Sequence, residues 1–230
     1  MIHQDKAAMK VCTDSCVFGA WVAQSANPSP KTILDIGSGT GLLSLMLAQH
    51  FGQSEIHALE IEPSAILQSQ QNFQNATFSK QLQLFPISIQ DFSNSTDRKY
   101  DVVICNPPFF SAHLLSDKEK NNIAKHNNTL SPSALSLSAS KLMNQESEFW
   151  LLIPTSASKE YISCFENNGL FLNECVEVFH NHTKPSFRLI IKFSKLNNNS
   201  LLNYKFIIQN QDGTYTNSFV ELLKKYYLNL

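Results

Sequence analysis

Three glycines at alternate positions, placed directly after a short apolar run, most constrain how this chain can fold. The run 32–36 is typical of a buried β-strand, and the segment 42–51 that comes soon after it has large apolar side chains spaced by fours, as in a helix. Gly37, Gly39 and Gly41 connect the two. Glycine lets the backbone turn sharply and lets a ligand approach it closely, and a helix N-terminus supplies amide donors. The spacing G-x-G-x-G is one residue shorter than that of dinucleotide-binding loops, so it favours a ligand without a pyrophosphate.

Strands and helices alternate along most of the chain, which is the pattern of an α/β doubly wound fold. We predict a Rossmann-like, mixed and mostly parallel seven-stranded sheet with helices on both faces, and a small C-terminal extension. The sheet is mixed because segments 175–179 and 187–193 bracket a short polar turn, as in a hairpin. The extension has a strand at 204–208 and a closing helix to Leu230. The remaining strands are predicted at 32–36, 55–59, 82–86, 101–105 and 149–153, and the remaining helices at 42–51, from Glu62 onward, at 132–143 and at 158–167.

Acidic residues follow the second and third predicted strands. Glu60 ends the strand 55–59, where a carboxylate can accept hydrogen bonds from two ribose hydroxyls. Asp91 follows the strand 82–86, where a carboxylate can accept a hydrogen bond from an adenine amino group. The alternative is a tight strand–helix turn with no ligand and solvated acids at the strand ends, and it carries more weight for Asp91 than for Glu60. Together with the glycine loop, the two acids favour a cofactor that contains a ribose and an adenine.

The tetrapeptide Asn106-Pro107-Pro108-Phe109 directly follows the apolar strand 101–105, at the edge where such folds bind ligands. Asn106 offers a side-chain carbonyl, and Pro107 offers a backbone carbonyl that fixed φ angles hold rigid. Phe109 offers a ring on which a base can stack, with a gain of about 1–3 kcal/mol. Carbonyls that accept hydrogen bonds from an aromatic amine draw its nitrogen toward sp³ geometry.

We therefore predict that residues 106–109 are catalytic and that the chain methylates an exocyclic nitrogen with S-adenosyl-L-methionine (SAM) as cofactor. The proton leaves after methyl transfer, so no general base is required. The rest of catalysis is the alignment of the nitrogen with the methyl group. An Asn-Pro-Pro turn that only ends a strand is the alternative.

The charge of the chain limits how it can bind RNA. A net charge of −1 and a pI of about 6.6 exclude a generally basic nucleic-acid binder. Any RNA contact must then come from a local patch. The candidates are Lys118, Lys120, Lys125 and His126 in a long polar segment and His180, His182, Lys184 and Arg188 around the turn 180–186. Solvated loop charge is the alternative for both clusters.

Composition also bounds the setting of the protein. No apolar run reaches the roughly 18 residues of a membrane span, and the polar N-terminus lacks the apolar stretch of a secretory signal. Five scattered cysteines without a Cys-x-x-Cys pair favour a reduced, cytoplasmic setting and no metal site.

With these residues in hand, the chain resembles class I SAM-dependent methyltransferases of the N6-adenine type, and more narrowly the bacterial tRNA(Val) adenine-37 N6-methyltransferases. The resemblance covers nearly the whole chain. It is carried by Ala8-Met9-Lys10-Val11-Cys12-Thr13-Asp14 with Gly19-Ala20-Trp21, by the loop from Leu34 to Leu43, by Asn106-Pro107-Pro108-Phe109, by 124–130, by Lys184-Pro185-Ser186-Phe187-Arg188 and by Tyr226-Tyr227-Leu228.

The resemblance implies a division of the chain and a role for each motif. Residues 1–30 would cover the cofactor, 31–195 would form the methyltransferase domain, and 196–230 would extend it with a strand and a helix. Thr13 would contact the methionine end of SAM, and Asp35 and Gly37 would lie by its amine. Glu60 would bind the ribose, Asp91 the adenine, and residues 106–109 the target base in a tRNA. The protein would act as a cytoplasmic monomer.

Two departures from the family and three alternative functions remain. Many members of the family have Arg where Lys125 stands and Tyr where Phe109 stands, and Lys makes no bidentate phosphate contact. Guanine N2-methyltransferases of ribosomal RNA and glutamine N5-methyltransferases of release factors use similar catalytic loops. Only about thirty residues precede the first strand, which argues against the separate substrate domain of the glutamine enzymes. The presence of Asn106 and of the complete glycine loop argues against a binding module without catalytic activity.

Overall fold

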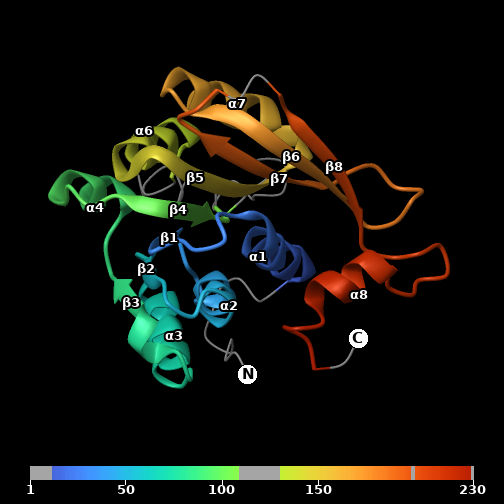
Figure 1. Ribbon diagram of the computed structural model, residues 1–230, viewed down its shortest axis with the longest axis horizontal. Helices are drawn as coiled ribbons and strands as arrows, with labels where there is room; N and C mark the ends of the chain where they lie inside the picture. The colour runs from blue at the N-terminus through green and yellow to red at the C-terminus, as the bar shows by residue number, and fades with distance from the viewer. Residues whose placement is uncertain (1–11, 109–129, 198–199, 229–230) are drawn as a thin grey trace, which may run out of the picture.

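A single twisted sheet organises the protein, whose computed structural model describes residues 12–108, 130–197 and 200–228. The strands are β1 (Thr32–Ile36), β2 (Glu55–Leu59), β3 (Leu82–Phe85), β4 (Tyr100–Cys105), β5 (Met143–Pro154), β6 (Phe171–Phe179), β7 (Arg188–Ser194) and β8 (Leu202–Ile207). Their order in the sheet is β3-β2-β1-β4-β5-β7-β6-β8 (Figure 1). Only β7 runs against its neighbours β5 and β6, so the sheet is mixed and mostly parallel, as predicted.

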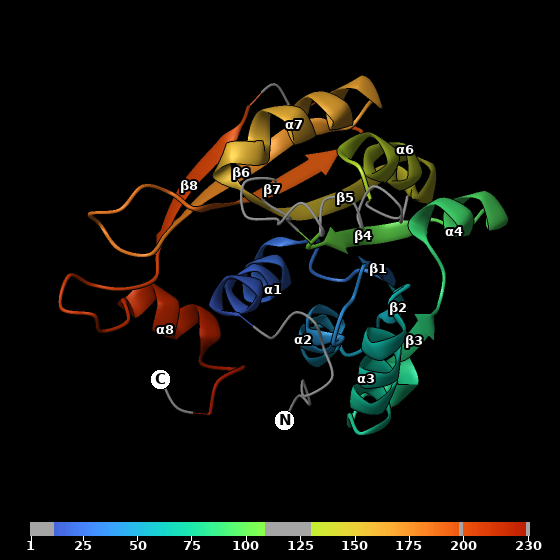
Figure 2. The ribbon, with the colours of Figure 1, turned by 180° about the vertical axis from the view of Figure 1, so that it is seen from behind.

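Helices cover both faces of this sheet. They are α1 (Thr13–Ser25), α2 (Leu42–His50), α3 (Pro63–Gln74), α4 (Ile89–Ser95), α6 (Pro132–Leu142), α7 (Ser158–Asn167) and α8 (Asn217–Leu223), with 3-10 turns η1 (Ser79–Gln81) and η2 (Thr155–Ala157). α1, α2, α3 and α8 lie on one face, and α4, α6 and α7 lie on the other, as Figure 2 shows from behind. No described helix is both long enough and apolar enough to cross a bilayer.

The core has two halves, one on each side of the sheet. Ile33, Val102 and Trp150 pack under α1 and α2, whereas Leu34 and Val103 pack under α4, α6 and α7. Successive side chains of a strand point to opposite faces, so a strand that is covered on both sides reads as a continuous apolar run. This is why the apolar runs of β1 and β4 were visible in the sequence.

β8 is an eighth strand where seven were expected. It pairs in parallel with β6, with Leu202 opposite Glu174 and Ile207 opposite Phe179, so the strand predicted for the extension belongs to the main sheet. Most of β8 is exposed. The strand itself was predicted at 204–208, and only its pairing with β6 was not.

Three predicted boundaries were wrong by four residues or more. β6 begins at Phe171 rather than at 175. β5 begins at Met143 rather than at 149, because its first residues are polar and give no apolar signal, although Met143 already pairs with Tyr100. The last helix, α8, ends at Leu223 instead of continuing to Leu230. The predicted start of α3 and end of α7 are correct: Glu62 accepts a hydrogen bond from the amide of Ala65, and Gly169 follows α7 with a φ of 74°.

The pairing of β1 with β4 places the two sequence motifs side by side. Ile36 and Cys105, the last residues of these strands, are partners across the sheet. The glycine loop that begins at Gly37 and the turn that begins at Asn106 therefore leave the same edge of the sheet from adjacent strands. In a parallel sheet this carboxyl edge is where ligands bind.

Candidate active site

The glycine loop has a backbone that other residues adopt only with strain. Gly37, Gly39 and Gly41 have φ angles of 69°, 57° and 81°. A Cβ atom built on Gly37 or Gly39 would meet no atom of the described residues within 4 Å, so within this part of the chain that side of the loop faces open space. A Cβ on Gly41 would instead clash with the ring of Phe73. Packing against α3 therefore already accounts for Gly41, while the first two glycines leave room for a ligand.

Asp35 lies under this loop and is fully buried. Its Oδ2 accepts hydrogen bonds from the amide and the hydroxyl of Ser44, at 3.1 and 2.7 Å. Its Oδ1 is buried and has no hydrogen-bond partner within the described ranges. Burial raises the pKa of Asp35 to about 7, although the hydrogen bonds from Ser44 act in the opposite direction. A buried acceptor without a partner is a place that a cationic or N–H group of a ligand can fill.

Glu60 ties the glycine loop to the end of β2. Its Oε2 accepts a hydrogen bond from the amide of Gly39 at 2.8 Å, and its Oε1 accepts from the amides of Ile61 and Glu62 at 2.7 and 2.9 Å. A carboxylate has about four acceptor positions. Three are used here, so Glu60 keeps acceptor capacity on Oε2, beside the open side of the loop.

Asp91 has a structural use that the sequence did not indicate. It lies in the first turn of α4, and its Oδ2 accepts a hydrogen bond from Ser88 Oγ at 2.7 Å. The amide of Asp91 donates to the same hydroxyl, so the two residues form a reciprocal helix cap. The side chain is exposed. Capping explains an acid at this position, and a contact with adenine stays a prediction.

Asn106 directly follows β4, and helix α1 holds its side chain. Its Nδ2 donates a hydrogen bond to Ser15 Oγ at 2.9 Å. Ser15 is buried and lies in the first turn of α1, where its hydroxyl is also 3.0 Å from Cys12 Sγ. The amide nitrogen of Asn106 only donates, so its carbonyl oxygen is the side-chain atom that can accept from a substrate. Pro107 is buried beside it.

Arg188 does not stand free at the turn where the sequence placed it as an RNA contact. Its Nε donates to Asp14 Oδ2 at 2.8 Å, which joins the start of β7 to α1. Lys184 is exposed, as expected of a phosphate contact. Thr13 is exposed in the first turn of α1, in a pocket of about 420 Å³ that Asp14 and Arg188 also line. Phe109, Lys118, Lys120, Lys125 and His126 lie outside the described residues.

Sequence reasoning missed three residues that shape this site. Ser44 binds Asp35, Ser15 binds Asn106, and Asp14 neutralises Arg188. Ser44 follows the glycine loop by a few residues at the start of α2, so a search for polar residues in that first turn would have found it. Ser15 had no such signal, because only the packing of α1 across the sheet brings it to Asn106.

Comparison with known proteins agrees with this geometry. The model of the methyltransferase small domain family matches residues 20–145. The chain is 39% identical to a tRNA1(Val) (adenine(37)-N6)-methyltransferase of Cytophaga hutchinsonii, with 100% of this chain and 95% of the relative covered. It is 38% identical to the protein of the same name from Dyadobacter fermentans, with 99% and 94% covered.

Solved structures show the same fold at low sequence identity. A predicted O-methyltransferase from Agrobacterium tumefaciens aligns with a TM-score of 0.70 at 15% identity, over 94% of this chain and 99% of the other. The glycopeptide N-methyltransferase MtfA, solved in complex with SAM, aligns with a TM-score of 0.60 at 10% identity, over 85% of this chain and 100% of the other. The fold is thus that of class I methyltransferases. With full-length relatives at this identity, the chain belongs to the family of the tRNA1(Val) (adenine(37)-N6)-methyltransferases.

Proposed function

We infer that this protein is a SAM-dependent methyltransferase that modifies N6 of adenine-37 in the anticodon loop of tRNA(Val). The observation that carries this conclusion is the position of Asn106, held by Ser15 at the end of β4 and beside the glycine loop that leaves β1. Full-length relatives that carry the name of this activity support the choice of nucleic acid and of base.

The residues at the glycine loop fit SAM. Asp35 Oδ1 is a buried acceptor without a described partner, and it suits the ammonium group of the methionine moiety. The open side of Gly37 and Gly39 gives room for the ligand, and the spare acceptor position of Glu60 suits a ribose hydroxyl. Bound there, SAM supplies an electrophilic methyl group on a sulfonium sulfur.

The chain itself contributes positioning and polarisation. We propose that Asn106 Oδ1 and the carbonyl of Pro107 accept hydrogen bonds from the target amine, so that the nitrogen lone pair is directed toward the methyl group instead of into the base. The hydrogen bond from Asn106 Nδ2 to Ser15 holds the amide in the orientation that this requires. Alignment of this kind is a large part of what enzymes contribute to bimolecular transfers. Phe109 as the stacking partner of the base stays a prediction.

Other features of the proposal follow from the sequence. We propose that the protein acts as a cytoplasmic monomer, that residues 1–30 cover the cofactor, and that Lys125, His126, Lys184 and Arg188 contribute to RNA binding. The exposed side chain of Lys184 supports its role. The ion pair of Arg188 with Asp14 leaves that arginine less able to bind phosphate.

A methylation assay on three substrates tests the proposed function. Transcribed tRNA(Val), ribosomal RNA and a release factor are incubated with the enzyme and labelled SAM, and the products are digested and identified by mass spectrometry. We expect N6-methyladenosine in tRNA(Val) alone, and no product from a tRNA(Val) transcript in which adenine-37 is replaced by guanine. N2-methylguanosine in ribosomal RNA, or methylglutamine in the release factor, would overturn the choice of substrate.

A further inference from the structure

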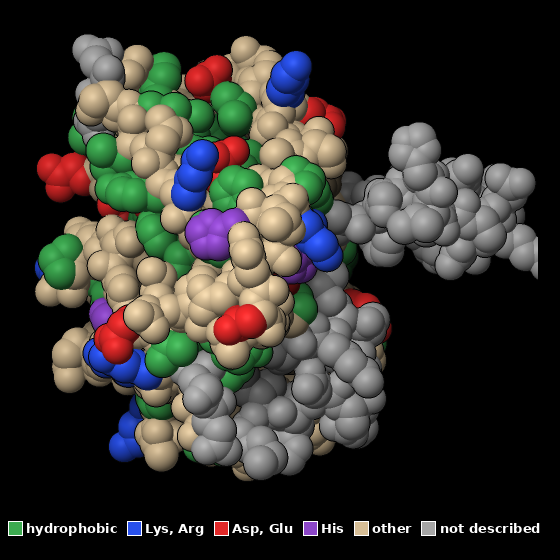
Figure 3. Space-filling model, turned by 90° about the vertical axis from the view of Figure 1, so that its right-hand side faces the viewer, with side chains coloured by type: hydrophobic (Ala, Val, Ile, Leu, Met, Phe, Trp, Pro, Cys, Tyr) green, Lys and Arg blue, Asp and Glu red, His purple; other side chains and the backbone are tan. Residues whose placement is uncertain are grey.

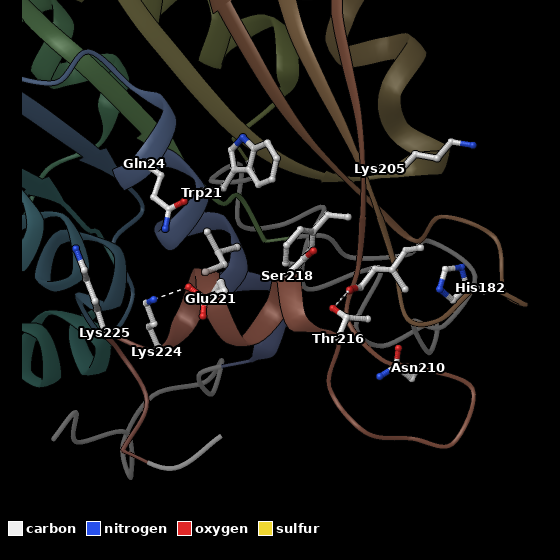
Figure 4. Close-up of a pocket in the computed structure, with 13 residues that line it drawn as sticks. Trp21, Gln24, His182, Lys205, Asn210, Thr216, Ser218, Glu221, Lys224 and Lys225 are labelled. Carbon is white, nitrogen blue, oxygen red and sulfur yellow. Dashed lines mark hydrogen bonds and ion pairs between the residues drawn. The ribbon is translucent and has the colours of Figure 1, made fainter.

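A groove of about 840 Å³ lies between α1, β8 and α8, away from the glycine loop (Figure 4). Trp21 of α1 forms part of one wall, and β8 and α8 form the others. Figure 3 looks onto the side of the molecule that β8 and α8 occupy, where Lys, Arg and His side chains lie among hydrophobic and acidic ones. No residue assigned above to the cofactor site or to catalysis lines this groove.

Basic side chains predominate among the charged residues of the groove. Lys205, Lys224, Lys225 and His182 line it, and all four are exposed. Figure 4 shows Lys224 and Lys225 at one end and Lys205 and His182 toward the other. Glu221 is the one acidic residue in the described lining, and it pairs with Lys224. The groove is therefore locally positive in a chain whose net charge is −1.

The fold places this groove on the flank of the catalytic edge. Trp21 follows Ser15 in the same helix by about six residues, which is roughly 9 Å along the helix axis, and Ser15 is hydrogen-bonded to Asn106. β8 is parallel to β6, and its last residue, Ile207, also lines the groove. The carboxyl end of β8 thus points to the same edge of the sheet as the ends of β1 and β4.

The RNA contacts predicted from the sequence do not by themselves form a row of positive charges for a phosphate backbone. Of the described candidates, Arg188 is paired with Asp14, and Lys184 is the exposed lysine at its turn. A nucleic-acid stem carries closely spaced phosphates, and binding to it draws mainly on Lys and Arg that lie along one surface. Lysines at both ends of an open groove suit such a row of charges better than a single cation does.

We propose that the groove between α1, β8 and α8 holds the phosphate backbone of the tRNA substrate while the target base lies at Asn106. The proposal rests on the proposed function, since it specifies where the same substrate is held. Lys205 and Lys225 supply positive charge, Lys224 shares its charge with Glu221, and the polar side chains of Gln24, Thr216 and Ser218 can bond phosphate and sugar oxygens. Such contacts position an RNA without reading its bases.

Neutralising the three lysines tests the proposal. In the variant Lys205→Gln/Lys224→Gln/Lys225→Gln, we expect tRNA(Val) to bind about tenfold more weakly or worse at moderate salt. The slope of log affinity against log salt should become shallower by about 2, because each lost phosphate contact removes roughly 0.7–0.9 from it. The variant Lys31→Gln/Lys80→Gln/Lys159→Gln removes the same charge from exposed positions elsewhere and should bind like the wild type. Affinity for SAM and the melting temperature should be unchanged in both variants.

Quenching of tryptophan fluorescence by acrylamide gives a second measurement, which does not depend on the net charge of a variant. Trp150 is fully buried, so Trp21 is the tryptophan that acrylamide can reach. Bound tRNA should protect Trp21 from quenching in the wild type and in the control variant. Equal tRNA affinity and salt slope in the two variants, or unprotected Trp21 in a tRNA-bound wild type, would overturn the groove proposal. Absence of tRNA methylation by the wild type would instead overturn the proposed function, and the groove proposal with it.

Discussion

Asn106 and Ser15, which are 91 positions apart in the chain, are joined by a hydrogen bond of 2.9 Å. The contact connects the turn after β4 to the first turn of α1. It engages the nitrogen of the Asn106 amide and leaves the oxygen for a substrate. The orientation of the catalytic side chain thus depends on a residue of the N-terminal helix.

Replacing Ser15 should slow methyl transfer without weakening SAM binding. In Ser15→Ala the amide of Asn106 loses its partner, and a hydrogen bond worth about 1 kcal/mol corresponds to a roughly fivefold lower kcat. Single-turnover rates with tRNA(Val) and calorimetry with SAM measure the two effects. If Ser15 acts through Asn106, Ser15→Ala should add little in an Asn106→Ala background. Additive losses in the double variant would contradict this role.

Removing the Asn106 side chain should affect chemistry far more than it affects cofactor binding. We expect Asn106→Ala to lower kcat by about 10²-fold or more, the size usual for a lost positioned polar contact in a transition state. Calorimetry should show SAM binding close to that of the wild type. Asn203→Ala, in the exposed strand β8, is the matched control and should keep full activity. Turnover near the wild-type rate in Asn106→Ala would rule out the catalytic role.

Two glycines offer a matched test of the cofactor loop. Gly37 and Gly169 have φ angles of 69° and 74°, and a Cβ on either would meet nothing within 4 Å among the residues that the structure describes. Alanine at each position should cost about 1–2 kcal/mol in stability, from the left-handed backbone alone. Only Gly37→Ala should also weaken SAM binding, because Gly169 lies beyond α7. Equal SAM affinity in the two variants would remove Gly37 from the cofactor site.

Asp35 should make the stability of the cofactor-free protein depend on pH. Burial raises its pKa to about 7, above the value of about 3.9 in an unfolded chain. The folded state therefore binds the proton more tightly, and this contribution to stability is fully present below about pH 4 and is lost as pH rises toward 7. Denaturant unfolding across this range should show the loss in the wild type and not in Asp35→Asn.

The same carboxyl group should couple SAM binding to proton release. An ammonium group beside Asp35 favours the carboxylate, so binding below pH 7 should release a proton, and SAM affinity should rise with pH until about 7. Calorimetry in buffers of different ionisation enthalpy counts the protons. Asp35→Asn should bind SAM weakly and without this pH dependence. An unchanged proton count in Asp35→Asn would place the ammonium group elsewhere.

Much of the fold could be predicted because its signals are local. The strands β1, β2 and β4 are apolar runs, and α3 and α7 carry residues that favour a helix start or end next to them. The polar start of β5 lacks such a signal, so that boundary was misjudged, and β8 was predicted as a strand but not as a member of the main sheet. Their place comes from backbone pairing with a neighbouring strand, which depends little on side-chain type.

For the candidate site, the sequence by itself determined the glycine loop and the Asn-Pro-Pro turn. Each of these is a short motif whose chemistry lies within a few consecutive residues. Asp35 was assigned only through the family resemblance, and its burial is seen only in the structure. Only the tertiary structure decided that Asn106 is bound by Ser15, that Arg188 is bound by Asp14 across 174 positions, and that three lysines share one groove. The physical reason is that strand order and helix packing set these contacts, and no spacing along the chain encodes which distant side chains will meet.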